Sequence, residues 1–207
     1  MKRLVIPGEL VTEDRKKLGS HVFVREGKIY SDAMGLVNDE SDFASVVPLE
    51  GKYMPQVGDL VIGIIGEEKF SVYMVDVNSF YQTVVSKRDL REPLKAGSVV
   101  SAKISKVSEL NDIDLQNPRV FFGGQIIDVN PVKIPRIIGR EASMLNIIKD
   151  GTKCNVIVGR NGRLWVKGGD IDLLKKVVQK IQDEAHLENL TNKIQDYLDK
   201  NKGKGEK

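Results

Sequence analysis

Cysteine and histidine are scarce in this chain, which has one cysteine and two histidines in 207 residues. Cys154 has no partner for an intrachain disulfide, and this favours a reducing, intracellular compartment, so we expect a cytoplasmic protein. His21 and His186 lie far apart in sequence and share no ligand spacing with Cys154. We therefore predict no metal site.

Long hydrophobic runs are also lacking. The apolar stretch at residues 61–65 contains Gly63, and no segment approaches the roughly 20 apolar residues that a membrane span requires. The first seven residues are basic at their start, but no long apolar region or small-residue cleavage site follows them, so we expect no signal peptide. A membrane is not among the expected partners.

Motifs for common enzyme chemistry are missing as well. The chain has no Gly-Lys-Ser/Thr phosphate loop, no dinucleotide-binding fingerprint and no Gly-x-Ser-x-Gly nucleophile motif. Glu109, Asp112 and Asp114 could form the carboxylate cluster of a two-metal nuclease. The segment 108–114 is explained more simply as a polar surface loop, so we predict no catalytic residue and no cofactor.

What the chain does carry is an uneven distribution of charge. The formal net charge is +3, but residues 1–55, 56–124 and 183–207 each have a net charge of −1. Residues 125–182 carry a surplus of +6. A localised basic surplus is typical of proteins that bind polyanions, because cations displace the counterions condensed on phosphates. Chance variation in a window of this length is the alternative explanation.

The first two segments of the chain are predicted to be β-structure. Residues 1–54 contain short strand candidates, including a hairpin at 21–31 with Gly27 in its loop, and form a small N-terminal β domain. Residues 55–124 contain strand candidates at 60–65, 71–77, 82–85, 98–106 and 119–122. Five short strands in about 70 residues favour a small closed barrel, and the OB fold has that strand count.

The third segment, residues 125–186, alternates strands and helices in the order β-α-α-β-β-α. A short helix is expected at 142–149, ended by Asp150-Gly151, and Asp170 is a plausible N-cap for an amphipathic helix that follows. Residues 187–207 are expected to form a further helix and a disordered tail from Lys200. The fold class is therefore multidomain, mainly β with an α+β portion.

Several fragments, taken in order, resemble the RNA-binding cap subunit of the archaeal exosome, the type called ribosomal-RNA-processing protein four. The resemblance covers about residues 4–186. The fragments are Val5-Ile6-Pro7-Gly8-Glu9-Leu10, Gly27-Lys28-Ile29-Tyr30-Ser31, Gly51-Lys52-Tyr53-Met54-Pro55-Gln56-Val57-Gly58-Asp59, Tyr73-Met74-Val75-Asp76-Val77-Asn78, Pro135-Arg136-Ile137-Ile138-Gly139 and Gly159-Arg160-Asn161-Gly162-Arg163-Leu164-Trp165-Val166.

The resemblance implies an N-terminal β domain (1–54), an OB-fold barrel of the ribosomal-protein S-one type (55–124), a KH domain (125–186) and a C-terminal helix and tail (187–207). It further implies that three copies cap a hexameric ring of phosphorolytic 3′–5′ exoribonucleases. The cap recruits single-stranded RNA and guides its 3′ end into the ring, for degradation or tailing, without being catalytic itself. The N-terminal domain, which is nearly neutral, and the hydrophobic turn segments are the expected contacts with the ring.

RNA binding directs attention to aromatic and cationic side chains, because unstacked bases lie on aromatic rings. On the barrel, strand alternation would place Phe70 with Val72 and Met74 on the core side, and Tyr73 on the opposite, exposed side. Phe80 and Tyr81 fall on a turn, where one of them could plug the barrel. The predicted RNA-binding residues are Lys69, Tyr73, Lys87, Arg88, Arg91, Arg136 and Arg140.

Two loops of the KH segment look alike but are predicted to differ in role. A KH domain uses Gly-x-x-Gly between two helices to let the RNA backbone approach, and the matching loop here is Gly139-Arg140-Glu141-Ala142. Ala142 restricts φ, and Glu141 places a carboxylate where a phosphate would lie, so strong binding there is not expected. The loop Gly159-Arg160-Asn161-Gly162 lies between strand candidates, and we predict a structural hairpin turn with Trp165 as a packing anchor.

Three other functions remain open at this level. A Nus-type transcription factor also places an OB barrel before KH units, although it normally carries two of them. A nuclease in its own right belongs to a different class and would degrade RNA as an isolated chain. A pure assembly scaffold would bind the ring and leave RNA untouched.

Overall fold

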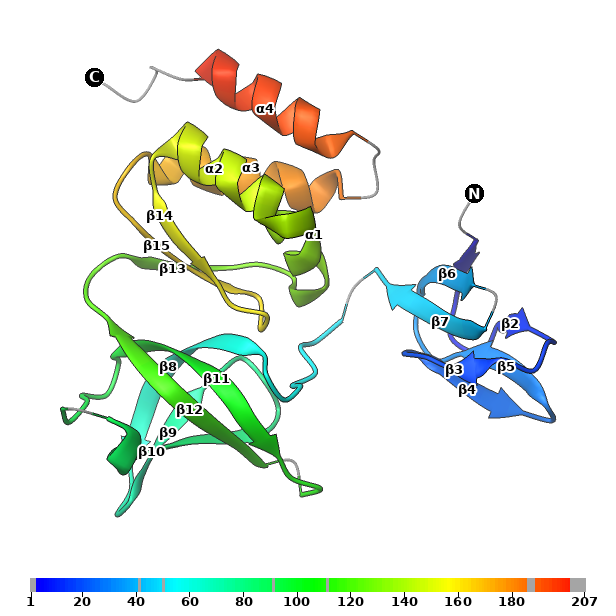
Figure 1. The fold of residues 1–207 in the computed structure, drawn as a ribbon, viewed down its shortest axis with the longest axis horizontal. Coiled ribbons are helices and arrows are strands. Elements are labelled where there is room, and N and C mark those ends of the chain that lie inside the picture. The colour runs from blue at the N-terminus through cyan, green and yellow to red at the C-terminus, as the bar shows by residue number, and fades with distance from the viewer. Residues whose placement is uncertain are drawn as a thin grey trace. The chain divides into compact units, whose positions relative to one another are not determined.

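The structure, a computed structural model, describes residues 3–40, 42–49, 51–90, 92–110, 112–185 and 189–201. The chain divides into two compact units, Met1–Gly51 and Lys52–Lys207, and each is described by itself. The multidomain, mainly β architecture predicted from the sequence is confirmed (Figure 1).

In the part of the first unit that the structure describes, short strands form two sheets. Their bounds are β1 (Leu4–Val5), β2 (Leu10–Thr12), β3 (Lys17–Leu18), β4 (Val22–Arg25), β5 (Lys28–Ser31), β6 (Gly35–Glu40) and β7 (Phe43–Pro48). One sheet has the order β1-β6-β7-β3 and the other β2-β5-β4. The predicted hairpin is β4–β5, whose turn residues Glu26 and Gly27 both have positive φ. Val5, Val11, Ile29, Ala44 and Val46 form the core.

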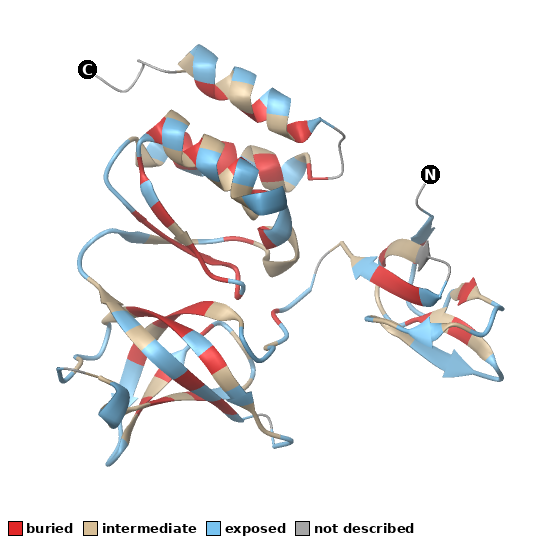
Figure 2. Ribbon diagram, in the orientation of Figure 1, coloured by how far each residue is buried: buried red, intermediate tan, exposed pale blue. Residues whose placement is uncertain are grey.

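The second unit begins with the barrel, which closes in the order β10-β12-β11-β8-β9. Its strands are β8 (Leu60–Glu68), β9 (Val72–Asp76), β10 (Gln82–Ser86), β11 (Val99–Val107) and β12 (Asp112–Phe121), and a 3₁₀ turn, η1 (Lys87–Asp89), follows β10. All neighbouring pairs are antiparallel except β10 with β12. Figure 2 shows buried residues alternating with exposed ones along these strands. The five-stranded barrel predicted from the strand count is confirmed.

The prediction of a surface loop at 108–114 was wrong for its second half, because β12 already begins at Asp112. Ile113 and Leu115 are buried in the barrel core, and Asp112 and Asp114, which alternate with them along the strand, are exposed. The period-two pattern of a half-buried strand was therefore present. Its outward positions carry charged residues, which made the segment resemble a loop.

The third segment has the predicted order β-α-α-β-β-α. Its elements are β13 (Gln125–Asp128), η2 (Pro131–Lys133), α1 (Ile134–Ile138), η3 (Arg140–Ala142), α2 (Ser143–Thr152), β14 (Asn155–Val158), β15 (Arg163–Lys167) and α3 (Ile171–Asp183). The sheet order is β13-β15-β14, and the helices gather on one side of this sheet (Figure 1). Buried residues of the sheet, α1, α2 and α3 share one hydrophobic core. Asp170 caps α3 as expected, since its carboxylate accepts a hydrogen bond from the Leu173 N–H at 2.8 Å.

A fourth helix, α4 (Leu190–Asn201), completes this core with Leu190, Ile194 and Leu198. The apolar stripe predicted a separate helix here, and the part of it from Leu190 onward is confirmed. Leu187 and residues 202–207 lie outside the described residues, while Lys200, expected in the tail, belongs to α4. No helix in the described ranges is long and apolar enough to cross a membrane.

The expected stop of α2 at Asp150-Gly151 was also wrong, because the helix continues to Thr152 and is ended by Lys153 at φ 58°. Gly151 serves a different purpose. A Cβ at this position would lie 2.7 Å from Cδ1 of Leu198, so the missing side chain lets α4 approach α2 closely. A glycine within a helix can thus mark helix packing instead of a helix end.

Candidate nucleic-acid interface

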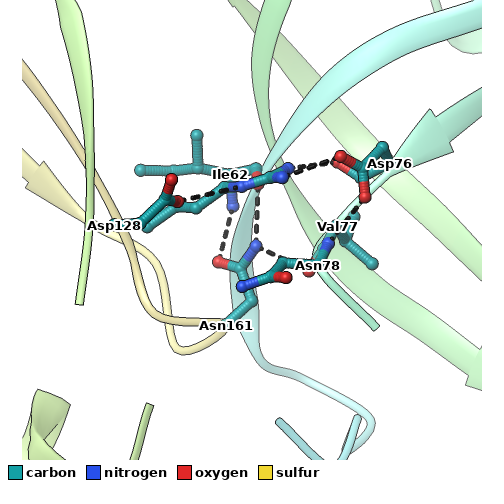
Figure 3. Close-up of polar contacts among 7 residues, drawn as sticks. Ile62, Asp76, Val77, Asn78, Asp128 and Asn161 are labelled. Atoms are coloured by element: carbon teal, nitrogen blue, oxygen red, sulfur yellow. Dashed lines mark hydrogen bonds and ion pairs between the residues drawn. The ribbon is translucent and has the colours of Figure 1, made fainter. Parts of the chain in front are cut away.

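The loop Gly159-Arg160-Asn161-Gly162 is the turn of the β14–β15 hairpin, and it contacts the barrel. The Asn161 side chain is completely buried. Its Oδ1 accepts a hydrogen bond from the Ile62 N–H at 3.1 Å, and its Nδ2 donates to the carbonyl oxygens of Ile62 at 2.8 Å and Val77 at 2.9 Å (Figure 3). One amide therefore joins the hairpin to β8 and to the chain just after β9.

Arg163, at the start of β15, makes the second contact of this kind. It is 8% exposed and donates hydrogen bonds to the Asp76 carbonyl at 2.6 Å and to the Asp76 carboxylate at 2.7 Å. Its Nε lies 3.4 Å from an oxygen of Asp128, completing an ion-pair arrangement around the guanidinium. We call Asn161, Arg163 and their partners Ile62, Asp76 and Val77 the barrel–KH junction.

The electrostatics of the junction follow from this pairing. Burial acts to raise the pKa of the Asp76 carboxyl, but hydrogen bonds from Arg163 and from the Asn78 N–H outweigh it and hold the pKa below its usual value. Arg160, the exposed neighbour of Asn161, lies 3.5 Å from a carboxylate oxygen of Asp59. The polar side chains of Asn161 and Arg160 in this loop thus contact the barrel.

The sequence predicted the turn but not the contact. The reason given for the Asn-Gly pair was tolerance of positive φ, and only Gly162 uses it, at +82°. Asn161 is required for its side chain, which bonds to backbone groups of β8 and of Val77, just after β9. An asparagine flanked by glycines fits both roles, so the pattern alone could not separate them.

The loop that corresponds to a KH phosphate-binding loop runs from Gly139 to Ala142, between α1 and α2. Gly139, Glu141 and Ala142 have φ values of 74°, 51° and 61°, so two side-chain-bearing residues adopt the left-handed region. Arg136, Arg140 and Glu141 are exposed. The carboxylate of Glu141 and the methyl group of Ala142 thus stand where a Gly-x-x-Gly loop would offer open backbone.

On the barrel, the expected sides of β9 were reversed. Tyr73 is 2% exposed and belongs to the barrel core, and its hydroxyl oxygen accepts a hydrogen bond from the Leu94 N–H at 3.2 Å. Phe70, expected in the core, is fully exposed in the β8–β9 turn. Residues of β9 do alternate between two sides, but an alternating pattern alone does not determine which side faces the barrel core. A tyrosine can be buried because its hydroxyl finds a partner.

The predicted barrel cations lie around one end of the barrel. The Lys87 N–H donates to the Ser71 carbonyl at 3.1 Å, which joins the start of η1 to the β8–β9 turn that carries Lys69. The Lys87 ammonium pairs with Glu68 at 2.6 Å and lies 5.3 Å from the Tyr73 ring centroid. Lys69 and Arg88 are exposed. Arg91 lies outside the described residues, and Arg136 and Arg140 belong to the KH segment.

The remaining aromatic candidates divide into exposed and packed rings. Phe80 is 76% exposed, with the Lys52 ammonium 3.7 Å from its ring centroid. Tyr81 packs against the barrel core. Trp165 stacks on Phe121 with ring centroids 4.3 Å apart, and its Nε1 donates to the Gly123 carbonyl at 2.9 Å. Trp165 is therefore a packing residue that also fixes the chain leaving the barrel.

The carboxylates considered for a nuclease do not assemble into a metal centre. Among the residues that the structure describes, no group of three or more His, Cys, Asp or Glu side chains could hold a metal ion. Asp112 and Asp114 stand on the outer side of β12, two residues apart on one strand.

Two family models match the chain. Residues 2–50 match the N-terminal domain of the exosome RNA-binding protein RRP4, and residues 124–172 match the KH domain. A crystal structure of a candidate exosome complex RNA-binding protein superposes with a TM-score of 0.65 at 28% sequence identity, covering 72% of this chain and 97% of that one.

Curated relatives align with nearly the whole length of this chain. Exosome complex component Rrp4 of Methanobrevibacter smithii is 39% identical, over 95% of this chain and 71% of the relative. The Pyrococcus abyssi component of the same name is 37% identical, over 95% of this chain and 82% of the relative. The resemblance seen in the sequence is confirmed, and the chain belongs to the Rrp4 family of exosome complex components.

Proposed function

We propose that this chain is the non-catalytic RNA-binding subunit of an exosome. It recruits single-stranded RNA and guides the 3′ end into a hexameric ring of phosphorolytic 3′–5′ exoribonucleases, with three copies on each ring. Relatives named as Rrp4 exosome components and a family described as RNA-binding support the proposal. We place the assembly in the cytoplasm.

The barrel–KH junction is the observation that carries the mechanism. Asn161 and Arg163 are buried between the two domains and bond to β8, to β9 and to Val77 just after it, and the barrel and the KH domain belong to one compact unit. A guide must hold its contacts in a fixed relation to the entrance that the RNA enters. The KH hairpin therefore orients the barrel, and the barrel offers the RNA contacts.

The proposed contacts are cationic. Lys69, Lys87 and Arg88 share one end of the barrel, Arg136 precedes and Arg140 lies within the altered loop of the KH domain, and Arg91 completes the set. Tyr73 contributes differently from the sequence expectation, because its buried ring supports the Lys87 ammonium and offers no face to a base. Contacts between cations and phosphates tolerate any sequence, which suits a subunit that feeds many RNAs to one nuclease.

The N-terminal unit is the proposed ring contact. Its described surface exposes large apolar side chains on both sheets, Leu4 and Phe43 on one and Phe23 and Val24 on the other. Exposed apolar groups on so small a unit favour a protein partner, since a polyanion would require cations. We accordingly assign residues 1–54 to the ring, 55–124 to RNA, and 125–186 to orientation, with 187–207 as a C-terminal extension.

The test measures RNA capture by the assembled complex. Replacing Lys69, Lys87 and Arg88 by alanine should weaken capture and reduce the magnitude of the slope of log K against log salt by about 2, given about 0.7 per phosphate contact on single strands. The matched control removes the same charge from Lys175, Lys176 and Lys193, which are exposed on α3 and α4.

Two results would contradict the proposal. Unchanged affinity and salt slope in the barrel variant would favour a pure scaffold. Degradation of 3′-labelled RNA by the isolated chain, with divalent metal or inorganic phosphate, would show a nuclease in its own right.

A further inference from the structure

The loop at the barrel–KH junction contains the one Asn-Gly pair of the sequence, Asn161-Gly162. Asparagine before glycine is the pair most prone to spontaneous deamidation, because glycine has no side chain to hinder attack of its backbone nitrogen on the asparagine amide. The Asn161 amide also holds the hairpin against β8 and against the chain just after β9. The group on which the junction depends is therefore, by sequence, the most reactive amide of the chain.

Deamidation needs only the chain and water. The Gly162 backbone nitrogen forms a bond to Cγ of Asn161 and gives up its proton, and the side-chain amino group takes up a proton and leaves as ammonia. The product is a cyclic succinimide. Addition of water to either carbonyl group of the ring then gives aspartate or isoaspartate.

The closed junction opposes this reaction at both reacting groups. The Asn161 amide is completely buried, and its oxygen and its nitrogen are hydrogen-bonded to Ile62 and Val77 of the barrel (Figure 3). The Gly162 N–H, which has to give up its proton, donates to the Gly159 carbonyl at 3.3 Å. Gly162 is itself buried, so solvent does not reach the attacking nitrogen.

Close packing also prevents the amide from turning toward that nitrogen. A Cβ at Gly159 would collide with Oδ1 of Asn161, and a Cβ at Gly162 would lie 2.5 Å from the Val129 carbonyl oxygen. The Gly162 carbonyl in turn accepts a hydrogen bond from the Val129 N–H at 2.7 Å. The backbone around the reacting atoms is therefore fixed as long as the hairpin stays on the barrel.

The reaction products no longer fit the junction. In aspartate an oxygen replaces Nδ2, and it meets the carbonyl oxygens of Ile62 and Val77, which lie 2.8 and 2.9 Å from Nδ2. These acceptors then face one another without a donor, at a buried carboxylate. The guanidinium of Arg163 in the same junction is already bonded to Asp76. Isoaspartate adds a methylene group to the backbone of the turn and disturbs the hairpin further.

We propose that Asn161-Gly162 is a latent deamidation site, silent while the KH hairpin is docked on the barrel and reactive when the hairpin opens. Local openings of this kind need less free energy than global unfolding. Reaction makes an opening permanent, because the product cannot form the original hydrogen bonds. The site depends on neither RNA nor the ring, so the inference goes beyond the proposed function.

The experiment incubates the full chain in mildly alkaline buffer, folded and in urea, and follows each asparagine by mass spectrometry of chymotryptic peptides. Asn78, which is exposed and precedes Ser79, is the internal reference. Arg163→Gln loosens the junction without changing the Asn-Gly pair, and Lys175→Ala, on the exposed side of α3, is its matched control. Asn161→Asp supplies the aspartate product without the reaction.

In urea we expect Asn161 to lose ammonia faster than Asn78, because glycine hinders the attack less than serine does. In the folded chain the order should reverse, with Asn161 at least about 30-fold slower than in urea, equivalent to about 2 kcal/mol of opening free energy. Arg163→Gln should speed the reaction of Asn161 in the folded chain, and Lys175→Ala should not. Asn161→Asp should unfold at a lower urea concentration than the wild type, increasingly so from about pH 4 to about pH 7, because only the protonated carboxyl can donate.

Three results would overturn the inference. Equal rates for Asn161 in the folded chain and in urea would show that the junction does not protect the amide. An unchanged rate in Arg163→Gln would show that opening of the junction does not control the reaction. A wild-type urea midpoint for Asn161→Asp at neutral pH would show that conversion leaves the junction closed.

Discussion

Replacing Asn161 by alanine tests the barrel–KH junction directly. The substitution removes three hydrogen bonds and leaves the Ile62 N–H and the carbonyl oxygens of Ile62 and Val77 without this partner, in a site closed to solvent. A buried polar group left unsatisfied costs about 1–3 kcal/mol, and relaxation and water entry recover part of the sum. We therefore expect a loss of about 2–5 kcal/mol in the free energy of unfolding.

The assay is equilibrium unfolding in urea, followed by tryptophan fluorescence and by far-ultraviolet circular dichroism. Trp165 is the only tryptophan and lies where β15 contacts Phe121 of the barrel, so its fluorescence reports on the junction. The control is Arg160→Ala, which removes the adjacent exposed side chain and one partly exposed ion pair worth about 0–1 kcal/mol. If Asn161→Ala unfolds within 0.5 kcal/mol of the control, the reasoning about the junction is wrong.

Three further predictions concern single positions. Ala142→Gly should stabilise the protein by about 1 kcal/mol in thermal unfolding, because alanine at φ 61° is strained and glycine is not; a destabilisation would show that the methyl group packs usefully. Asp170→Ala should cost about 1 kcal/mol in urea unfolding through loss of the α3 N-cap, and Asp172→Ala, two residues further along in the first turn, should cost less. The pKa of Asp76 is lowered in the folded state, so its stabilising contribution is present above the unfolded pKa of about 4 and is lost as the pH falls below that value. Asp76→Asn should therefore flatten the acid side of a plot of unfolding free energy against pH. An unchanged acid side would contradict the assignment.

The sequence predicted the folding units where a pattern is local. The Glu26-Gly27 hairpin, the Asp170 cap and the order of the third segment all depend on residues within a few positions of one another. Each strand of the barrel is also predicted from a local pattern, and the number of strands then predicts the closed barrel. The resemblance to the exosome cap family added the assignment of the units to RNA and to the ring.

Apart from the strand at Asp112, whose local pattern was present in the sequence, what the sequence did not supply depends on residues far apart along the chain. The alternating pattern correctly divided the residues of β9 between its two sides. Only the closed barrel determines that the side of Tyr73 faces inward and that Phe70 is exposed. Gly151 predicted a helix end, but in the structure its missing side chain makes room for Leu198 of α4. Asn161 indicated a turn, but its partners lie 84 and 99 positions away along the chain. No local pattern contains that information.

The central claim is that this chain caps an exosome ring, and native mass spectrometry of a co-purified assembly tests it most directly. The tagged full chain is expressed with the ring subunits of the same source, isolated through its tag and weighed intact. The account predicts a stable assembly of three copies of this chain on a six-membered ring. Recovery of the tagged chain free of ring subunits, under conditions in which the ring itself assembles, would contradict the account.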